Sequence, residues 1–292
     1  MPDDPTALHR PVLLAETLER LQPASGERML DCTLGLGGHA LALLERGVSV
    51  VGIDRDPRAR ALAAERLEAF APRLEIRGGT YADAAEELAK AGQRFDGVLA
   101  DLGVSSMQID DDARGFSIRS GVRADMRMGD GCPEDAMALI DRLTDDDLAN
   151  VIFAYGEERL SRRIARALKL ARASGGCETA EDVAAVVRSV VPGHSRRHPA
   201  MRTFQALRIA VNDEIGQLER LLVVLPDLLT DGGRAVVISF HSLEDRAVKQ
   251  SFRAHHAAGR FSDLGRRVTI AGPVESSANP RSAPAKLRWA RK

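Results

Sequence analysis

The sequence predicts an α/β fold in which a mostly parallel sheet, with helices on both faces, is interrupted by a mainly helical insertion. Apolar segments of strand length alternate with helical patterns from about residue 28 to 104, which is the alternation that builds parallel sheets. The alternation stops near Val104 and resumes beyond about Met201. We therefore expect one sheet domain in two parts, residues 1–104 and 203–292, separated by a helical domain at residues 105–202.

The first part is expected to hold four buried strands, because four short apolar runs end at polar or glycine-containing segments. These strands lie at residues 29–31, 48–53, 74–76 and 95–102. Helical spacing of apolar residues precedes and separates them, at residues 12–21, 40–44, 57–70 and in a stretch that ends at Leu88. Pro57 stands where the third of these helices would begin, a position that suits its fixed backbone angle.

The clearest helix of the insertion is expected at residues 157–173. Its apolar face is marked by Leu160, Ile164, Leu168 and Ala171. The second part of the sheet domain begins with a long helix at about 203–225, followed by an apolar strand at 235–240. Ser242 is expected to cap the next helix because Asp245 lies three residues on. Strands at 268–270 and 287–290 complete the sheet.

Composition excludes several classes of protein. An apolar fraction of 44% and a charged fraction of 28% are typical of an ordinary globular protein, and a formal net charge of −1 gives no global attraction for nucleic acid. The three cysteines, Cys32, Cys132 and Cys177, have no paired spacing, so we expect a reducing, cytoplasmic setting without a disulfide frame or zinc site. The acidic start and the short apolar runs predict neither a signal peptide nor a membrane span.

The glycine-rich turn after the first strand predicts a site for a nucleotide-type cofactor. Gly35, Gly37 and Gly38 follow the strand closely, a helix comes next, and the second strand ends at Asp54. Glycines allow a tight turn and a close approach to a ligand, and an acid at the next strand end can accept both ribose hydroxyls. The alternatives are a turn without a ligand and, because Gly35-x-Gly37-x-x-Ala40 fits the dinucleotide pattern, a nicotinamide or flavin enzyme.

Asp31 argues against the dinucleotide alternative. A carboxylate just ahead of the glycines would repel a pyrophosphate but would attract a ligand ammonium group. S-adenosylmethionine (SAM) has an adenosine, no phosphate and an ammonium group on its methionine tail. The sequence therefore favours SAM over a nicotinamide cofactor.

Polar residues after the third and fourth strands extend this candidate site. Ligands of open α/β sheets bind at the carboxyl ends of the strands. Tyr81 could lie against an adenine ring or be a half-buried tyrosine of the core. The stretch from Asp101 to Gln108 offers an acid, two hydroxyls and an amide, or is an ordinary turn before a loop. His241, after a later strand, could be a base or a structural residue.

A basic stripe on the 157–173 helix is open to two interpretations. It consists of Arg159, Arg162, Arg163, Arg166, Lys169 and Arg172. It is either a solvated face paired with acids such as Glu157 and Glu158, or a surface that faces phosphates. Five further basic residues, Arg196, Arg197, His198, Arg202 and Arg208, strengthen the second interpretation without deciding between the two.

Motifs spread over nearly the whole chain, in the right order, resemble the bacterial RsmH (MraW) family. They are D-C-T-L-G-L-G-G-H (31–39), G-I-D-R-D-P (52–57), A-D-L-G-V-S-S-M-Q-I-D (100–110), R-G-F-S (114–117), D-M-R-M (125–128), Y-G-E-E-R (155–159), H-P-A-M-R-T-F-Q-A-L-R-I-A-V-N-D-E (198–214), S-F-H-S-L-E-D-R-A-V-K (239–249) and N-P-R (279–281). Members of that family methylate N4 of a cytosine in the decoding region of 16S ribosomal RNA. The resemblance implies a Rossmann-like, SAM-dependent methyltransferase sheet with an inserted helical substrate domain.

The resemblance also implies roles for individual residues. Cofactor contacts would come from Gly37, Gly38, His39, Asp54, Tyr81, Asp101 and Gln108. Two departures from the family pattern are Ala124 and Gly129, on either side of D-M-R-M, and a third is Ala283-Pro284, where a basic residue and a serine are usual. None of these departures touches the cofactor motifs.

The expected reaction is methyl transfer from SAM to an exocyclic amine, with S-adenosylhomocysteine as the other product. Asp101, or the turn that contains Ser105, is the candidate acceptor of a hydrogen bond from the amine. Neither a cysteine nucleophile nor a metal is expected. The candidates for RNA binding are Arg159, Arg162, Arg163, Arg166, Arg196, Arg197 and Arg202. The expected partner is the small ribosomal subunit. No membrane association is expected, and the sequence leaves open whether the protein forms a homodimer. The alternative functions are methylation of a different acceptor and a role as a SAM-binding assembly factor without turnover.

Overall fold

The computed structural model describes residues 11–129, 131–191 and 198–292. The chain forms two compact units, one made of the residues up to Gly103 together with Ile215–Lys292, the other of Val104–Glu214. The second unit therefore begins where the sequence alternation stops but ends beyond residue 202. Its last helix, α10 (Met201–Asn212), belongs to the insertion because Phe204 and Leu207 are buried in the core of that unit.

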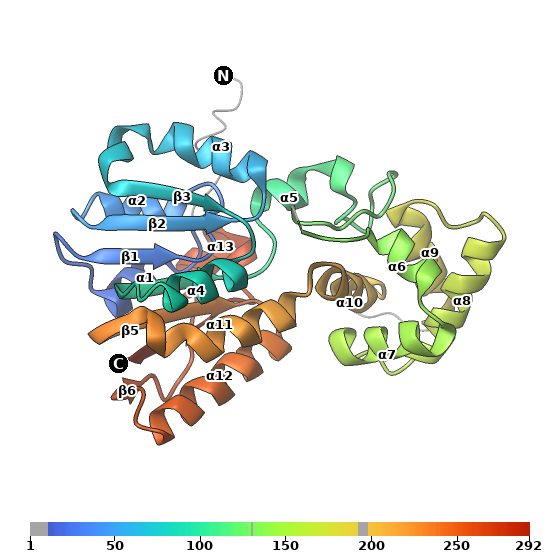
Figure 1. Cartoon of the computed structure of the whole chain (residues 1–292). Helices are drawn as coiled ribbons and strands as arrows, with labels where there is room; N and C mark the ends of the chain where they lie inside the picture. Colours follow the sequence, from blue (N-terminus) through green and yellow to red (C-terminus); the bar gives the residue numbers. More distant parts are fainter. Residues whose placement is uncertain (1–10, 130, 192–197) are drawn as a thin grey trace. The chain divides into compact units, whose positions relative to one another are not determined.

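The first unit contains a doubly wound sheet, which confirms the predicted fold class. Its strands are β1 (Arg28–Asp31), β2 (Ser49–Asp54), β3 (Leu74–Gly78), β4 (Phe95–Asp101), β5 (Leu229–Ser239), β6 (Asp263–Leu264), β7 (Thr269–Ile270) and β8 (Lys286–Arg291). The order is β3-β2-β1-β4-β5-β8-β6, and β7 also pairs with β8. The pairs among β1 to β5 are parallel, whereas β8 runs antiparallel to β5 (Figure 1). The order reverses between β1 and β4, where such sheets bind their ligands.

Helices cover both faces of this sheet. They are α1 (Leu14–Leu21), α2 (Gly38–Leu44), α3 (Pro57–Arg66), α4 (Tyr81–Lys90), α11 (Glu214–Leu228), α12 (Ser242–Ala257) and α13 (Pro273–Ala278), with short 3-10 helices at Glu68–Arg73 and Pro280–Ser282. Successive strand residues are buried in different cores: Met29 packs with α1 and α2, and Leu30 packs with α4 and α11. This alternation is the physical reason for two helical layers.

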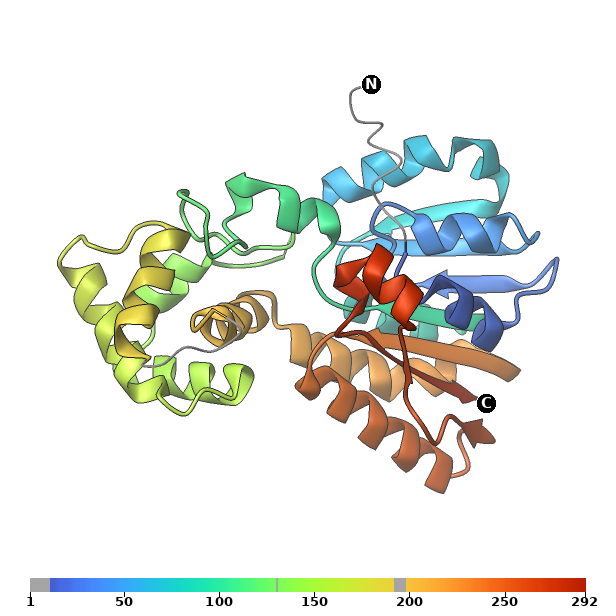
Figure 2. The same cartoon turned by 180° about the vertical axis from the view of Figure 1, so that it is seen from behind.

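The C-terminal segment returns to the start of the described chain. Figure 2 shows α13 on the side of the sheet turned away in Figure 1. There the Glu275 carboxylate accepts a hydrogen bond of 2.7 Å from the backbone N–H of Leu13. Among the described residues, no helix combines the length and apolar character needed to cross a bilayer.

The second unit is mainly helical, as its sequence indicates. It contains α5 (Ser106–Asp110), a 3-10 turn at Asp112–Arg114, α6 (Ala136–Arg142), α7 (Asp145–Gly156), α8 (Ser161–Ala173), α9 (Ala180–Val190) and α10. A single apolar core, which includes Leu148, Ile152, Ile164 and Leu168, joins these helices.

Two predicted helices are divided differently in the structure. The helix expected at 157–173 begins only at Ser161, because Glu157 adopts a left-handed conformation (φ 50°) that ends α7. The helix expected at 203–225 is two helices, α10 and α11, separated by Asp213 with the same left-handed φ of 50°. Neither position is a glycine, the residue most common at such helix ends. The apolar spacing therefore predicted one continuous helix across each break.

Asn212 holds together the loop that contains the D-M-R-M motif. Its side-chain oxygen accepts hydrogen bonds from the backbone N–H of Met128 (2.8 Å) and from the thiol of Cys132 (3.2 Å). Its side-chain nitrogen donates to the carbonyl oxygens of Met126 (2.7 Å) and Arg208 (2.9 Å). Asn212 is only 2% exposed. One buried amide therefore fixes the loop onto the end of α10.

We expect Asn212→Ala to lower the free energy of unfolding by about 2–3 kcal/mol, because it leaves buried backbone groups without hydrogen bonds. Denaturant unfolding measures this loss. Ser174→Ala, an exposed substitution in the same unit, is the control and should change stability by less than about 0.5 kcal/mol. Equal stability of the two variants would contradict the role given to Asn212.

Candidate cofactor site

Three carboxylates lie at the carboxyl ends of three neighbouring strands. β1 ends at Asp31, β2 at Asp54 and β4 at Asp101, and these strands are adjacent in the order β2-β1-β4. The glycine-rich turn leaves the same end of β1. The structure thus brings together, at one edge of the sheet, residues that the sequence analysis chose separately.

The turn after β1 requires its glycines. Gly35 and Gly37 have positive φ values of 52° and 74°, and Gly37 is the N-cap of α2. A Cβ on Gly37 would lie 2.7 Å from a methyl carbon of Leu67, and one on Gly38 would lie 2.6 Å from Cγ of Pro11. Side chains at these positions would collide with these neighbours, so packing against them requires glycine here.

Asp54 fastens this turn to the second strand. One carboxylate oxygen accepts from the N–H of Gly35 and the other from the N–H of Asp56, both at 2.8 Å. Burial raises the pKa of Asp54, and these two hydrogen bonds oppose the rise. Capping of α3 falls to Asp56, whose side chain accepts from the N–H of Arg58 at 3.0 Å. Asp54 therefore has a different task from helix capping, consistent with its predicted role toward a ribose.

Asp31 is a buried acid with unused hydrogen-bonding capacity. It is 1% exposed, and one oxygen accepts from the N–H of Thr33 at 3.1 Å. The other oxygen, Oδ2, is buried and has no hydrogen-bond partner among the described residues. Burial raises the pKa of Asp31 to about 6. The adjacent thiol of Cys32 is buried too, and burial raises its pKa, so it is not a nucleophile at neutral pH.

Asp101 and His39 form a second polar pair beside Asp31. Nε2 of His39 lies 3.5 Å from Oδ2 of Asp101, and their side chains are 8% and 23% exposed. The backbone N–H of Asp101 donates to the Thr33 hydroxyl at 2.6 Å, which ties β4 to the glycine turn. Oδ1 of Asp101 is buried and has no hydrogen-bond partner within the described residues.

The electrostatics of this group favour a cationic ligand. Burial lowers the pKa of His39, but the carboxylate of Asp101 at 3.5 Å, together with the charge of Asp31, outweighs this effect and raises the pKa. Two carboxylates with free buried oxygens attract a positive charge, and hydrogen bonds would repay the cost of their burial. The ammonium and sulfonium groups of SAM supply such charge, so the residues present fit this cofactor.

Tyr81 begins α4 directly after its N-cap, Thr80, whose hydroxyl accepts from the N–H of Asp83. The tyrosine is half-buried and packs against the apolar core that contains Leu88 and Phe95. Its contact with an adenine ring stays a prediction.

Gln108 and Ser105 belong to the second unit, where they close a capping box on α5. The Ser105 hydroxyl accepts from the N–H of Gln108 at 3.2 Å, and the Gln108 side-chain oxygen accepts from the N–H of Ser105 at 3.0 Å. The Gln108 amide also donates to the carbonyl of Met128 at 2.8 Å. The spacing Ser-x-x-Gln could have announced this box, which the sequence analysis missed. Roles for Gln108 toward the cofactor and for Ser105 in catalysis stay predictions.

The basic stripe of α8 separates into two groups. Arg159, Arg162, Arg163 and Arg166 are exposed, and none forms an ion pair with another described residue. Lys169, in contrast, donates to three carbonyl oxygens at the end of α6, and Arg172 pairs with Asp141 and Glu178 at 2.5 Å each. The first group is available to phosphates, whereas the second is structural.

Other basic candidates differ in the same way. Glu158, suggested as a partner for the stripe, lies 3.8 Å from Nη1 of Arg202, which remains 62% exposed. Arg208 forms a two-pronged ion pair with Glu214, at 2.8 and 2.9 Å, and is structural. Arg196 and Arg197 lie outside the described residues.

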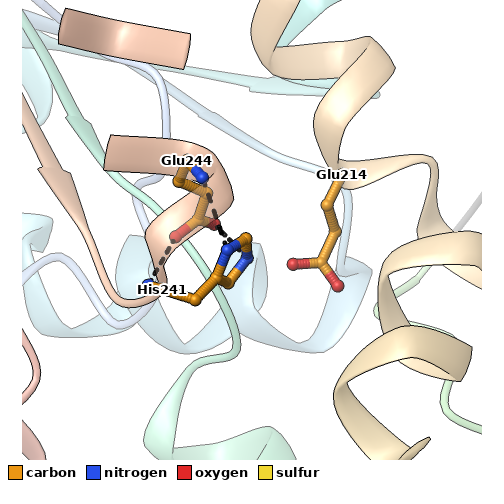
Figure 3. Close-up of side chains that lie close together, drawn as sticks. All are labelled: Glu214, His241 and Glu244. Atoms are coloured by element: carbon orange, nitrogen blue, oxygen red, sulfur yellow. Dashed lines mark hydrogen bonds and ion pairs between the residues drawn. The ribbon is translucent and has the colours of Figure 1, made fainter. Parts of the chain in front are cut away.

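His241 is the N-cap of α12, which corrects the expectation that Ser242 has this role. Figure 3 shows the pair that it forms with Glu244. Nδ1 of His241 accepts from the N–H of Glu244 at 3.4 Å, and the Glu244 carboxylate accepts from the N–H groups of Phe240 (2.8 Å) and His241 (3.3 Å). The side chains of this pair are buried. The structural interpretation of His241 is therefore supported. Figure 3 also draws Glu214, the first residue of α11.

Comparison with known proteins identifies the family of the chain. The sequence profile of the MraW methylase family matches residues 6–292. The chain is 47% identical over 288 residues to ribosomal RNA small subunit methyltransferase H of Sorangium cellulosum, covering 97% of this chain and 90% of that protein. It is 46% identical to the protein of the same name from Deinococcus deserti, covering 99% and 96%. A SAM-dependent O-methyltransferase structure from Thermotoga maritima aligns over 99% of this chain and 70% of its own, with 9% identity and a TM-score of 0.44.

The profile match spans nearly the whole chain, and the relatives share almost half of its residues over almost their full length. The chain therefore belongs to the MraW methylase family, and SAM is its cofactor.

Proposed function

We propose that the protein transfers a methyl group from SAM to N4 of a cytosine in the decoding region of 16S ribosomal RNA. The observation that carries the proposal is the buried group of Asp31, His39 and Asp101, with two free carboxylate oxygens beside a glycine turn. The names of the relatives support small-subunit ribosomal RNA as the substrate. The choice of cytosine N4 depends on the family resemblance.

The cofactor would be held along the carboxyl edge of β1, β2 and β4. The glycine turn at Gly35 and Gly37 would present backbone to it, Asp54 would accept the ribose hydroxyls, and Asp31 would face the ammonium group. When bound, SAM supplies a methyl group made electrophilic by the sulfonium. The side chains of the protein would orient the methyl acceptor and accept its proton.

Asp101 is suited to orient the methyl acceptor. The cytosine amine is a poor nucleophile because its lone pair is delocalised into the ring, so it must be aligned and must donate a hydrogen bond as it reacts. Oδ1 of Asp101 can accept that bond, since it is the free oxygen of this carboxylate among the described residues. The target base must leave its stack to reach such a pocket.

The exposed arginines of α8, Arg162, Arg163 and Arg166, together with Arg159 just before the helix, would bind RNA phosphates. We expect Arg163→Glu and Arg166→Glu each to weaken RNA binding about 3- to 10-fold and to reduce the salt slope by about one. SAM affinity should not change. Binding titrations over a range of salt concentrations measure both quantities.

The matched control for these variants is Arg188→Glu on α9, an exposed cation of the same unit that forms no ion pair with another described residue. It should have a smaller effect than either α8 variant. If all three variants bind RNA as tightly as the wild-type protein does, the α8 surface is a solvated face that does not bind RNA.

The direct test combines the purified protein, methyl-labelled SAM and small ribosomal subunits from cells that lack this activity, followed by nucleoside analysis. Label in N4-methylcytidine is the expected result. Label in another nucleoside would assign a different acceptor. SAM binding without any label would favour a role in subunit assembly and overturn the proposed reaction.

A further inference from the structure

His39 has more charged neighbours than a residue that only lines a cofactor site would need. It is the second residue of α2, its ring is buried, and carboxylates from two different strands act on it. Nε2 lies 3.5 Å from Oδ2 of Asp101, and the charge of Asp31 also acts on the ring. Both carboxylates keep one buried oxygen without a described partner.

The charges around His39 come from three strands. β1 contributes Asp31 and β4 contributes Asp101, and both act on His39. β2 contributes Asp54, whose charge acts on Asp31. The segment before α1 contributes only the backbone of Val12, and the Cys32 thiol stays protonated. Arg60 of α3 is the cation that acts on Asp54, whereas His39 is the cation that acts on Asp31 and lies beside Asp101, and burial opposes its protonation.

We propose that His39 is a positioning residue that exchanges a proton for the positive charge of the cofactor. Nε2 holds a proton toward Asp101 while the site contains no sulfonium, and gives it up when SAM is bound. A nearby charge alters the proton affinity of a group by about ten- to a thousandfold. The imidazolium of His39 then balances the ionised carboxylates in the absence of SAM, and the sulfonium balances them when SAM is bound.

This exchange provides a destination for the proton of the reaction, if the proposed function holds. During methyl transfer the N4 electron pair forms the new bond to carbon, the carbon–sulfur pair stays on sulfur, and N4 loses one proton. Asp101 takes that proton on Oδ1 and, after rotation of its carboxyl group, delivers it to Nε2 of His39. The sulfonium charge disappears as the imidazolium charge appears, so the net charge of the buried group is unchanged.

The binding step tests the proposal without RNA. Calorimetry of SAM and of S-adenosylhomocysteine, in buffers with different ionisation enthalpies between about pH 6 and 8, counts the protons released. We expect SAM to release up to about one proton more than S-adenosylhomocysteine. His39→Gln should abolish the difference, since Gln keeps a hydrogen-bond donor but does not titrate. His256→Gln, on the outer side of α12, should retain it.

Equal proton release for the two ligands in the wild-type protein, or a difference that persists in His39→Gln, would overturn the proposal. Should that variant fail to fold, NMR of ring-labelled histidine in the wild-type protein decides: the His39 ring must titrate at lower pH with SAM than with S-adenosylhomocysteine. Because neither measurement uses an acceptor, failure to find N4-methylcytidine would leave this inference standing, and its own failure would leave the proposed reaction standing.

Discussion

Asp101→Asn is expected to reduce single-turnover methylation at saturating SAM by about 100- to 1000-fold, the usual cost of removing a positioned proton acceptor. The Asn side chain keeps the shape and can still accept one hydrogen bond, but it has no negative charge to balance a developing cation. It also weakens the attraction for protonated His39, which lies 3.5 Å away. The loss should therefore appear in the rate more than in SAM affinity.

The measurement is a rapid-quench assay on unmodified small subunits, with SAM binding measured in parallel. Asp227→Asn, at an exposed carboxylate paired with Arg260 on the surface of the first unit, is the control and should keep the wild-type rate. An Asp101→Asn enzyme with full turnover would exclude this carboxylate as the acceptor and direct attention to Ser105.

Asp31→Asn is expected to stabilise the protein while weakening SAM binding. The pKa of Asp31 is about 6 in the folded chain, above the ordinary value of 3.8. A group with a raised pKa contributes stability that is present below about pH 4 and is lost as the pH rises through about 6. At pH 7 to 8 its ionised form costs on the order of 3 kcal/mol, from about two pKa units at ~1.4 kcal/mol each. Asn avoids that cost and can still accept from Thr33.

In the proposed site the same carboxylate faces the ammonium group of the cofactor. We expect Asp31→Asn to bind SAM about 10- to 100-fold more weakly at pH 7.5, the usual loss of a charge-assisted hydrogen bond. In the wild-type protein, SAM affinity should fall as the pH drops through about 6, and this dependence should be weaker in the variant, where only the proton of His39 contributes to it. Calorimetry and thermal unfolding measure both effects.

The control for this pair of effects is Asp263→Asn, at an exposed position of β6. It should change neither quantity. A variant at Asp31 that is less stable than the wild type and binds SAM normally would show that this acid is structural.

Local pattern was sufficient for the sheet and for part of the site. Apolar runs that stop at or near Asp31, Asp54 and Asp101 can be recognised in the sequence, and parallel strands place their carboxyl ends at the same edge of a sheet. The glycine turn was visible for the same reason, because only glycine tolerates the backbone angles and close contacts found at Gly37. Periodicity was less reliable at helix ends, where Glu157 and Asp213 adopt left-handed conformations without a glycine.

The sequence by itself determined the class of fold, the family resemblance and the acids at the carboxyl ends of β1, β2 and β4, since these depend on short-range spacing and residue type. Only the tertiary structure decided which polar groups have partners. It separates the exposed arginines from Arg172, makes Asn212 the anchor of a loop, and buries His39 within 3.5 Å of Asp101. The reason is that hydrogen bonds, burial and charge pairing depend on neighbours brought together from distant strands and helices, which one-dimensional patterns do not specify.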